Sequence, residues 1–89
     1  MLTVMKFGGS SLSTVERVAN VASIIASGVN DDDRVVAVVS ARGKTTDELT
    51  KVRDSITAVS VPRESDVLLS TGEQVSMSLL AMKLNEMGH

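Results

Sequence analysis

The feature that most restricts the fold of this sequence is a pair of short apolar segments on either side of one helical pattern. Residues 2–7 (LTVMKF) are apolar and partly β-branched, and their length suits a strand rather than a helix. Residues 34–40 (RVVAVVS) form a continuous apolar run, which is typical of a parallel strand covered on both faces. Between these segments, apolar residues recur at the spacing of one helix face, at Val15, Val18, Ala19, Ala22, Ile25, Ala26 and Val29. The pattern predicts a βαβ unit.

The handedness of such a unit predicts where a ligand binds. A βαβ crossover is right-handed in almost all proteins, so the ends of the two strands, Lys6 and Ser40, should lie at the same carboxyl edge of the sheet. Open α/β sheets bind their ligands at this edge.

A lysine and a glycine loop end the first strand. Lys6 is followed by Gly8, Gly9 and Ser10. Glycines let backbone N–H groups approach an anion that a Cβ would hold off, and the lysine adds a positive charge. The stretch therefore predicts a site for the phosphates of ATP.

Capping patterns predict the ends of the helices. Ser13 with Glu16, and Thr45 with Glu48, match the capping box that begins a helix. Gly28 is a natural left-handed residue at a helix end. The second helix should present one apolar face, formed by Leu49, Val52, Ile56 and Val59.

The last third of the chain predicts an interrupted helix. Pro62 disfavours helical geometry at the residue before it, so the second helix should end there. Residues 66–69 could form a helical turn that Gly72 weakens or kinks, and residues 74–87 form a helix that is apolar on nearly every side. Such a helix should be buried, with its methionines filling gaps in the core and Gly88 as its stop.

Composition excludes several classes of function. The nine Lys and Arg are scattered among eleven Asp and Glu, and Phe7 is the one aromatic residue, so we expect no nucleic-acid partner. The sequence has no cysteine and its one histidine is His89, so we expect no protein-bound metal site. The acidic run 30–33 is expected to be a solvated turn. No apolar run is long enough to span a bilayer, and we expect no membrane association and a cytoplasmic location.

Four blocks of sequence carry a family resemblance. They are KFGGSS at 6–11, VVSA at 38–41, TTDEL at 45–49 and DVLLSTGEQVS at 66–76. In this order and spacing they resemble the N-terminal segment of aspartate kinase, in the amino-acid kinase superfamily. The resemblance implies an α/β fold, a partial three-layer α/β/α sandwich of the carbamate kinase-like type with a mainly parallel sheet.

The resemblance also implies an activity. Aspartate kinases transfer the γ-phosphoryl group of ATP, carried with Mg²⁺, to the side-chain carboxylate of L-aspartate, the first step toward lysine, threonine and methionine. By similarity, Lys6 would contact the transferred group, and Gly8, Gly9 and Ser10 would donate to the nucleotide phosphates. Ser40 and Thr46 would contact the substrate.

Glu73 would accept the α-ammonium group of the substrate, again by similarity. Simpler roles remain open: Lys6 as a surface lysine, Ser40 as a strand end, Thr46 as a helix cap, and Glu73 as an acid at the N-terminus of a helix. Arg42 and Lys44 stand where relatives more often have apolar or small residues, and we favour solvated loop charges over a role with an anionic substrate.

The same resemblance implies that much of an aspartate kinase is absent from these 89 residues. We expect residues 1–89 to be an N-terminal fragment of one kinase domain, without a second domain and without the regulatory ACT domains. The fragment alone should be inactive, and the full-length enzyme should be a homo-oligomer. Two alternatives stay open: a non-catalytic interaction module, and a related kinase with another carboxylate or carbamate substrate.

Overall fold

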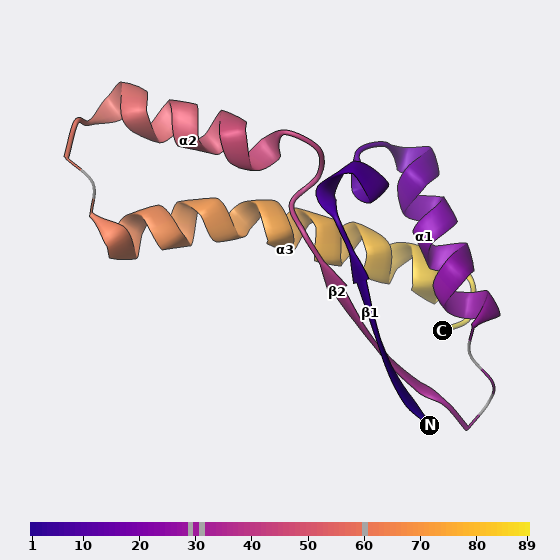
Figure 1. The fold of residues 1–89 in the computed structure, drawn as a ribbon. Helices are drawn as coiled ribbons and strands as arrows, with labels where there is room; N and C mark the ends of the chain where they lie inside the picture. The colour runs from indigo at the N-terminus through magenta and orange to yellow at the C-terminus, as the bar shows by residue number, and fades with distance from the viewer. Residues whose placement is uncertain (29, 31, 60) are drawn as a thin grey trace.

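The residues that the structure describes fold into two parallel strands and three α-helices (Figure 1). The computed structural model describes residues 1–28, 30, 32–59 and 61–89. In chain order the elements are strand β1 (Leu2–Phe7), the 3-10 turn η1 (Gly9–Leu12), helix α1 (Val15–Ser27), strand β2 (Arg34–Val39), helix α2 (Thr45–Ile56) and helix α3 (Pro62–Glu86).

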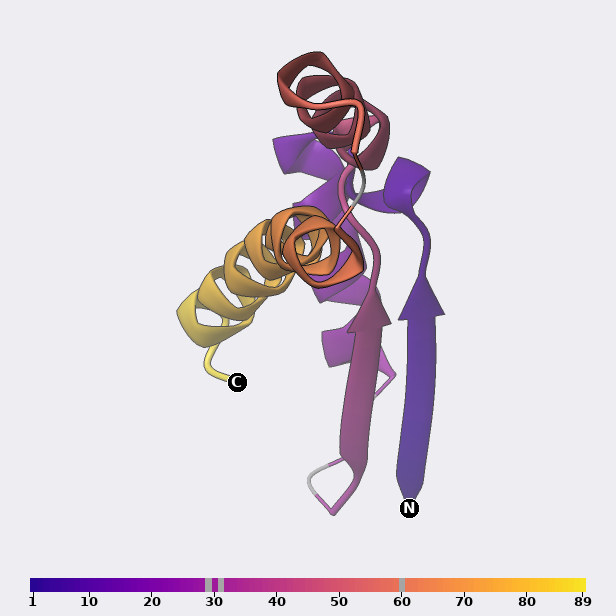
Figure 2. The ribbon, with the colours of Figure 1, turned by 90° about the vertical axis from the view of Figure 1, so that its left-hand side faces the viewer.

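The predicted βαβ unit is confirmed. Strands β1 and β2 pair in parallel (Figure 2). Their register runs from Leu2 opposite Arg34 to Phe7 opposite Val39. The carboxyl ends of both strands therefore lie side by side, and the loops that follow them, 8–13 and 40–44, leave the same edge of the sheet.

Helices α1 and α3 cover one face of this sheet. The core consists of buried side chains from η1, α1 and α3, with alternate strand residues packed against it: Leu12, Val18, Val21, Ala22, Ile25 and Leu80, with Met5, Phe7, Val35, Ala37 and Val39. The described residues thus build two of the three layers expected of the sandwich.

The prediction that strand 34–40 is covered on both faces is wrong for the residues described. Side chains alternate along a strand, and those that point away from α1 and α3 stay open: Val36 is 48% exposed and Val38 44%. Their neighbours Leu2 and Val4 on β1 are 63% and 64% exposed. One face of the sheet is therefore apolar and uncovered by any described residue.

Two of the predicted helix caps are wrong. The residue before α1 is Thr14, whose side-chain oxygen accepts from the amide of Arg17 at 3.1 Å. The Ser13 hydroxyl instead donates to the carbonyl oxygen of Ser10 at 3.0 Å, so it belongs to the preceding turn. Thr45 is the first residue of α2 and follows Lys44, so it lies inside the helix and not at its cap.

Helices α1 and α3 end at the two glycines predicted from the sequence. Gly28 follows α1, although its φ of −90° is not left-handed as predicted. Gly88 follows the end of α3 with a φ of +91°, a conformation that favours glycine. Asn30 and Asp33 make the expected turn, in which the Asp33 amide donates to the Asn30 carbonyl at 2.9 Å. Two residues of these predictions, Val29 and Asp31, lie outside the described residues.

Helix α3 is continuous, which corrects the predicted interruption. Pro62 occupies its first turn, where a missing N–H has no consequence and the fixed φ favours the helix. Gly72 lies inside the helix. A glycine is needed at this position because α3 passes close to the loop after β2, and a Cβ on residue 72 would be 2.8 Å from the Cβ of Ala41. Packing therefore outweighs the weak helix propensity of glycine.

The prediction that the C-terminal helix is buried all round is also wrong. The buried residues of α3 are mostly small: Ser65, Gly72, Ser76 and Leu80. Met77 and Met82 are 57% and 65% exposed, so these methionines do not fill the core. No helix in the described ranges is long and apolar enough to cross a membrane.

Candidate functional site

Lys6 is the next-to-last residue of β1 and lies on the open face of the sheet. Its neighbours Met5 and Phe7 pack against the core, and the alternation of the strand turns Lys6 to the opposite side. It lies opposite Val38 of β2 and is exposed. Among the described residues, no ion pair engages its ammonium group. Its charge is therefore available to a ligand at the carboxyl edge.

The glycine loop begins immediately after β1. Gly8 has an extended backbone (φ −78°, ψ 172°) and precedes η1, whose first hydrogen bond runs from the Ser11 amide to the Gly8 carbonyl at 3.1 Å. The amides of Gly9 and Ser10 come before this bond and are not used by it. A Cβ added to Gly8 would meet no atom of the described residues within 4 Å. The loop is thus open at Gly8, as a phosphate site requires.

Gly9 has a structural role that the sequence did not predict. A Cβ at this position would lie 2.7 Å from the carbonyl oxygen of Ala41, and the Gly43 amide donates to the Gly9 carbonyl at 2.9 Å. Only a glycine permits so close an approach. Because Gly9 has no side chain, the two loops at the carboxyl edge can come into contact there. The donation of the Gly9 amide to a phosphate stays a prediction.

Two arginines hold the turn, Arg17, which sequence patterns did not single out, and Arg42. Arg17 Nη1 donates to the Ser10 carbonyl at 2.8 Å. Arg42 Nε donates to the Leu12 carbonyl at 2.8 Å, and the Arg42 side chain is half-buried. The preferred interpretation of Arg42 as a solvated loop charge is therefore wrong, since it binds the backbone of the other loop. Lys44 is exposed.

The three residues predicted on the substrate side lie next to a single contact. The position of a Cβ on Gly72 would be 2.8 Å from Ala41 Cβ and 3.4 Å from Thr45 Cγ2. Ser40, Thr46 and Glu73 are the sequence neighbours of these three residues. The fold thus brings segment 40–46 and the middle of α3 together beside the glycine loop. The roles of Ser40, Thr46 and Glu73 toward a substrate stay predictions.

These three residues differ in their surroundings. Ser40 is half-buried, and its amide donates to the Phe7 carbonyl at 3.3 Å, so it continues the ladder between the strands. Thr46 and Glu73 are exposed. Glu73 lies near the middle of α3, so the alternative of an acid at a helix N-terminus is wrong. Its role toward a substrate stays a prediction.

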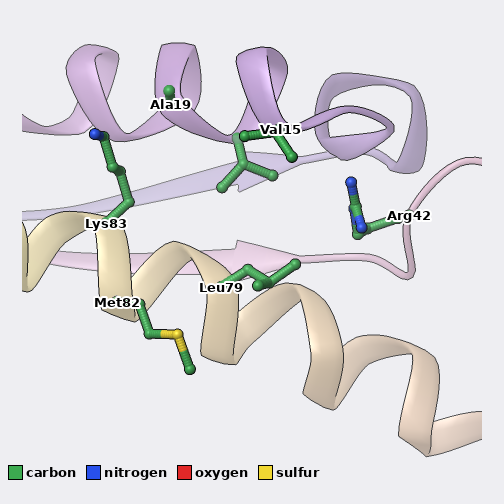
Figure 3. Close-up of a pocket in the computed structure, with 7 residues that line it drawn as sticks. Val15, Ala19, Arg42, Leu79, Met82 and Lys83 are labelled. Atoms are coloured by element: carbon green, nitrogen blue, oxygen red, sulfur yellow. The ribbon is translucent and has the colours of Figure 1, made fainter.

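An apolar groove runs between α1 and α3. Its volume is about 210 Å³, and it is lined by Val15, Val18, Ala19, Arg42, Leu79, Met82 and Lys83 (Figure 3). Arg42 marks its end nearest the glycine loop. In the ranges described, no three His, Cys, Asp or Glu side chains lie close enough together to hold a metal ion.

The fold and the site define a class. It is a parallel α/β unit with a lysine and an open glycine loop at the carboxyl edge of its strands, the edge at which open α/β sheets bind ligands. The chain matches the amino acid kinase family over residues 1–89, and it belongs to that family.

Individual relatives point in the same direction. The chain is 53% identical over 88 residues to an aspartokinase of Bacillus sp. (strain MGA3), which is 99% of this chain and 21% of that protein. It is 50% identical over 88 residues to an aspartokinase of Geobacillus stearothermophilus, 99% of this chain and 22% of that protein. The chain therefore spans about a fifth of the length of these relatives.

A solved structure agrees with the fold. The crystal structure of aspartate kinase from Synechocystis superposes with a TM-score of 0.92 at 48% sequence identity, over 98% of this chain and 15% of that one. The predicted family and the partial α/β sandwich are confirmed.

Proposed function

We propose that residues 1–89 form the N-terminal segment of an aspartate kinase. The observation that carries this proposal is the likeness to aspartate kinase from Synechocystis, at 48% identity over 98% of the chain. The reaction would transfer the γ-phosphoryl group of ATP to the side-chain carboxylate of L-aspartate. The bond between the γ-phosphorus and the ADP oxygen breaks, a bond to the carboxylate oxygen forms, and 4-phospho-L-aspartate and ADP leave.

The proposed chemistry needs no general base. The aspartate carboxylate has a reference pKa of about 3.9 and is ionised at neutral pH, so the nucleophile needs no deprotonation. Phosphoryl transfer depends mostly on the alignment of the reactants and on the stabilisation of charge on the phosphoryl oxygens. The residues of this chain are suited to these two tasks.

The phosphate side of the proposed site is Lys6 with the glycine loop. The Lys6 ammonium would stabilise the negative charge of the transferred group. The amides of Gly8 and Gly9, together with the hydroxyl of Ser10, would donate to the nucleotide phosphates. The open space at Gly8 and the unengaged charge of Lys6 fit a bound triphosphate. Mg²⁺, carried with ATP, would neutralise further phosphate charge when bound.

The substrate side of the proposed site is formed by the other two segments. The hydroxyl groups of Ser40 and Thr46 would donate to a substrate carboxylate, and Glu73 would accept the α-ammonium group of aspartate. The contact between Ala41 and Gly72 supports this assignment, because it holds these segments beside the glycine loop.

Further parts of the proposal concern the whole enzyme. We place the reaction at the start of lysine, threonine and methionine biosynthesis, and we place the enzyme in the cytoplasm, where ATP and free aspartate are available. Full-length relatives are about five times longer, so we assign the remaining nucleotide contacts to sequence outside these residues and expect a homo-oligomer.

The test uses a full-length kinase that contains these residues. With ATP and aspartate it should form an acyl phosphate that hydroxylamine traps as the hydroxamate, and other amino acids and carboxylates should give little product. No trapped product from aspartate would exclude the proposed substrate. Lys6→Ala should lower kcat about 10²- to 10³-fold, as removal of a charge-stabilising donor does. Lys51→Ala, an exposed lysine on α2, is the matched control and should leave kcat unchanged.

The open sheet face favours one second candidate. Leu2, Val4, Val36 and Val38 form an exposed apolar surface, which in an isolated chain would favour association with other chains. In this reading the 89 residues are a non-catalytic interaction module. A stable oligomer in size-exclusion chromatography that binds no ATP in calorimetry would favour the module over the kinase segment.

A further inference from the structure

Two loops leave the carboxyl edge of the sheet, and one arginine joins them. In the proposed function, loop 8–13 binds the ATP phosphates and segment 40–46 binds aspartate. We infer that Arg42 is a positioning residue that fixes the placement of one loop relative to the other. This inference rests on the proposed function and adds to it a residue that touches neither substrate.

The Arg42 side chain crosses from its own loop to the glycine loop. Its Nε donates to the Leu12 carbonyl at 2.8 Å, and its Nη2 lies 3.5 Å from the Ser13 carbonyl oxygen. Figure 3 shows the guanidinium nitrogen atoms directed from the loop after β2 toward the turn that leads into α1. The first bond is short and charge-assisted, and such bonds are stronger than neutral ones.

The partner carbonyl depends on this donor. Leu12 is fully buried, and it is the last residue of η1, where carbonyl groups lack partners within the turn. A guanidinium presents its donors in a rigid plane, so a bond from Nε also fixes the direction of approach. A lysine could reach the same carbonyl with its charge but would not fix this geometry.

The backbone around Arg42 extends the connection in both directions. The Gly43 amide donates to the Gly9 carbonyl at 2.9 Å, and the Ala41 carbonyl oxygen lies against Gly9. The Thr45 amide donates to the Arg42 carbonyl at 2.9 Å, at the start of α2. A displacement of the glycine loop would therefore move segment 40–46, and Arg42 is the side chain that resists it.

The consequence for the reaction follows from alignment. Two bound reactants must meet at about 3 to 3.5 Å, and a misplacement of about 1 Å can cost about 10²-fold in rate. Without Arg42 each loop would still bind its own substrate, but the two substrates would be less well aligned. Loss of Arg42 should therefore lower kcat and leave the two KM values nearly unchanged.

The test is a series of variants in the full-length kinase, with both substrates varied. Arg42→Ala should lower kcat about 10- to 100-fold and change each KM by less than about 3-fold. Arg42→Lys should recover part of the loss, and guanidinium ion at low concentration should raise the kcat of Arg42→Ala saturably. Arg63→Ala, an arginine whose side chain is 89% exposed, is the matched control.

A second measurement reports on the loops without activity. In Arg42→Ala, the Gly43 amide should exchange its hydrogen faster by NMR than in the parent, because its bond to Gly9 opens more often. Faster exchange supports the inference even if aspartate proves not to be the substrate, which the hydroxamate assay decides separately. An unchanged Gly43 exchange rate, an unchanged kcat, or a rise in one KM at constant kcat would overturn it. If Arg42→Ala does not fold, the same criteria apply to Arg42→Lys.

Discussion

The contact between α3 and the loop after β2 permits a sharp test of the fold. A Cβ on Gly72 would lie 2.8 Å from Ala41 Cβ, whereas carbon atoms in good contact are about 3.5 to 4.0 Å apart. The Ala41 Cβ is attached directly to the backbone and has no rotamer to change. In Gly72→Ala, α3 or the loop must therefore move by about 1 Å.

Two opposing terms set the size of the effect. Alanine in place of glycine inside a helix stabilises it by about 1 kcal/mol. Overpacking of a methyl group into a close contact costs about 1 to 3 kcal/mol. We therefore expect the free energy of unfolding of Gly72→Ala to fall by up to about 2 kcal/mol. Because the neighbouring residues are Glu73 and Ser40, the KM for aspartate should rise as well.

A double-mutant cycle isolates the contact. Ala41→Gly removes the methyl group that Gly72→Ala would meet, so the two substitutions together should show a favourable coupling energy of about 1 to 3 kcal/mol. Urea denaturation of the parent, the two single variants and the double variant measures it. Ser78→Ala, at an exposed position of α3, controls for helix propensity alone. If Gly72→Ala is more stable than the parent by about 1 kcal/mol, or if the coupling energy is near zero, the close approach of α3 to this loop is refuted.

Three further predictions concern stability. Leu80→Ala removes a core side chain that is 4% exposed and should cost about 2 to 5 kcal/mol, against less than about 0.5 kcal/mol for Met82→Ala at 65% exposure, in urea denaturation. Thr14→Ala removes the side-chain cap of α1 and should cost about 0.5 to 2 kcal/mol in the same assay. The pKa of Asp33 is lowered by the Asn30 amide and then by the N-terminal ammonium group. Its contribution to stability is therefore present above the usual carboxyl pKa and lost as the pH falls through the lowered value, so acidification should destabilise Asp33→Asn less than the parent.

Each of these predictions has a result that contradicts it. Equal losses for Leu80→Ala and Met82→Ala would mean that α3 does not pack on α1 as described. A loss for Ser13→Ala as large as for Thr14→Ala would restore the cap first predicted from sequence. For Asp33, an equal loss of stability on acidification in Asp33→Asn and in the parent would mean that the Asp33 carboxylate does not stabilise the folded chain.

The two strands and the first helix were predictable because the pattern of apolar residues alone indicates each of these elements. Residues 35–39 are apolar without interruption, and the spacing of the apolar residues in 15–29 suits one helix face, so the βαβ pattern admitted little else. The sequence could not show which strand face would be covered. That depends on the placement of α3, which packs beside α1 on the same face.

Helix α3 was mispredicted because local signals and tertiary contacts disagree there. Pro62 can end a helix or begin one, and the tertiary packing of the residues that follow it decides which of the two occurs. Gly72 disfavours a helix on propensity, yet its lack of a side chain is what lets α3 pass beside Ala41. A propensity of about 1 kcal/mol is outweighed by such packing.

The common sheet edge of Lys6 and Ser40 was predictable from topology, whereas the connections within the candidate site were not. Thr46 and Glu73 come from the motifs, and their part in the site stays a prediction. The bonds from Arg17 and Arg42 to backbone carbonyls depend on the direction of long side chains, for which the sequence has no periodic signal. Nor did any pattern indicate that Gly9 would be required by the neighbouring loop.

Helix α2 differs from the other helices in a way that bears on local unfolding. It lies wholly within the described residues, contains no buried side chain and packs mainly along α3, beyond the end of the sheet (Figure 1). Its amides should therefore exchange with solvent through local opening long before those of α1, which lie over the core. Thr46 lies in its first turn, so one proposed substrate contact would lie on this weakly held helix, and a bound substrate would slow exchange there.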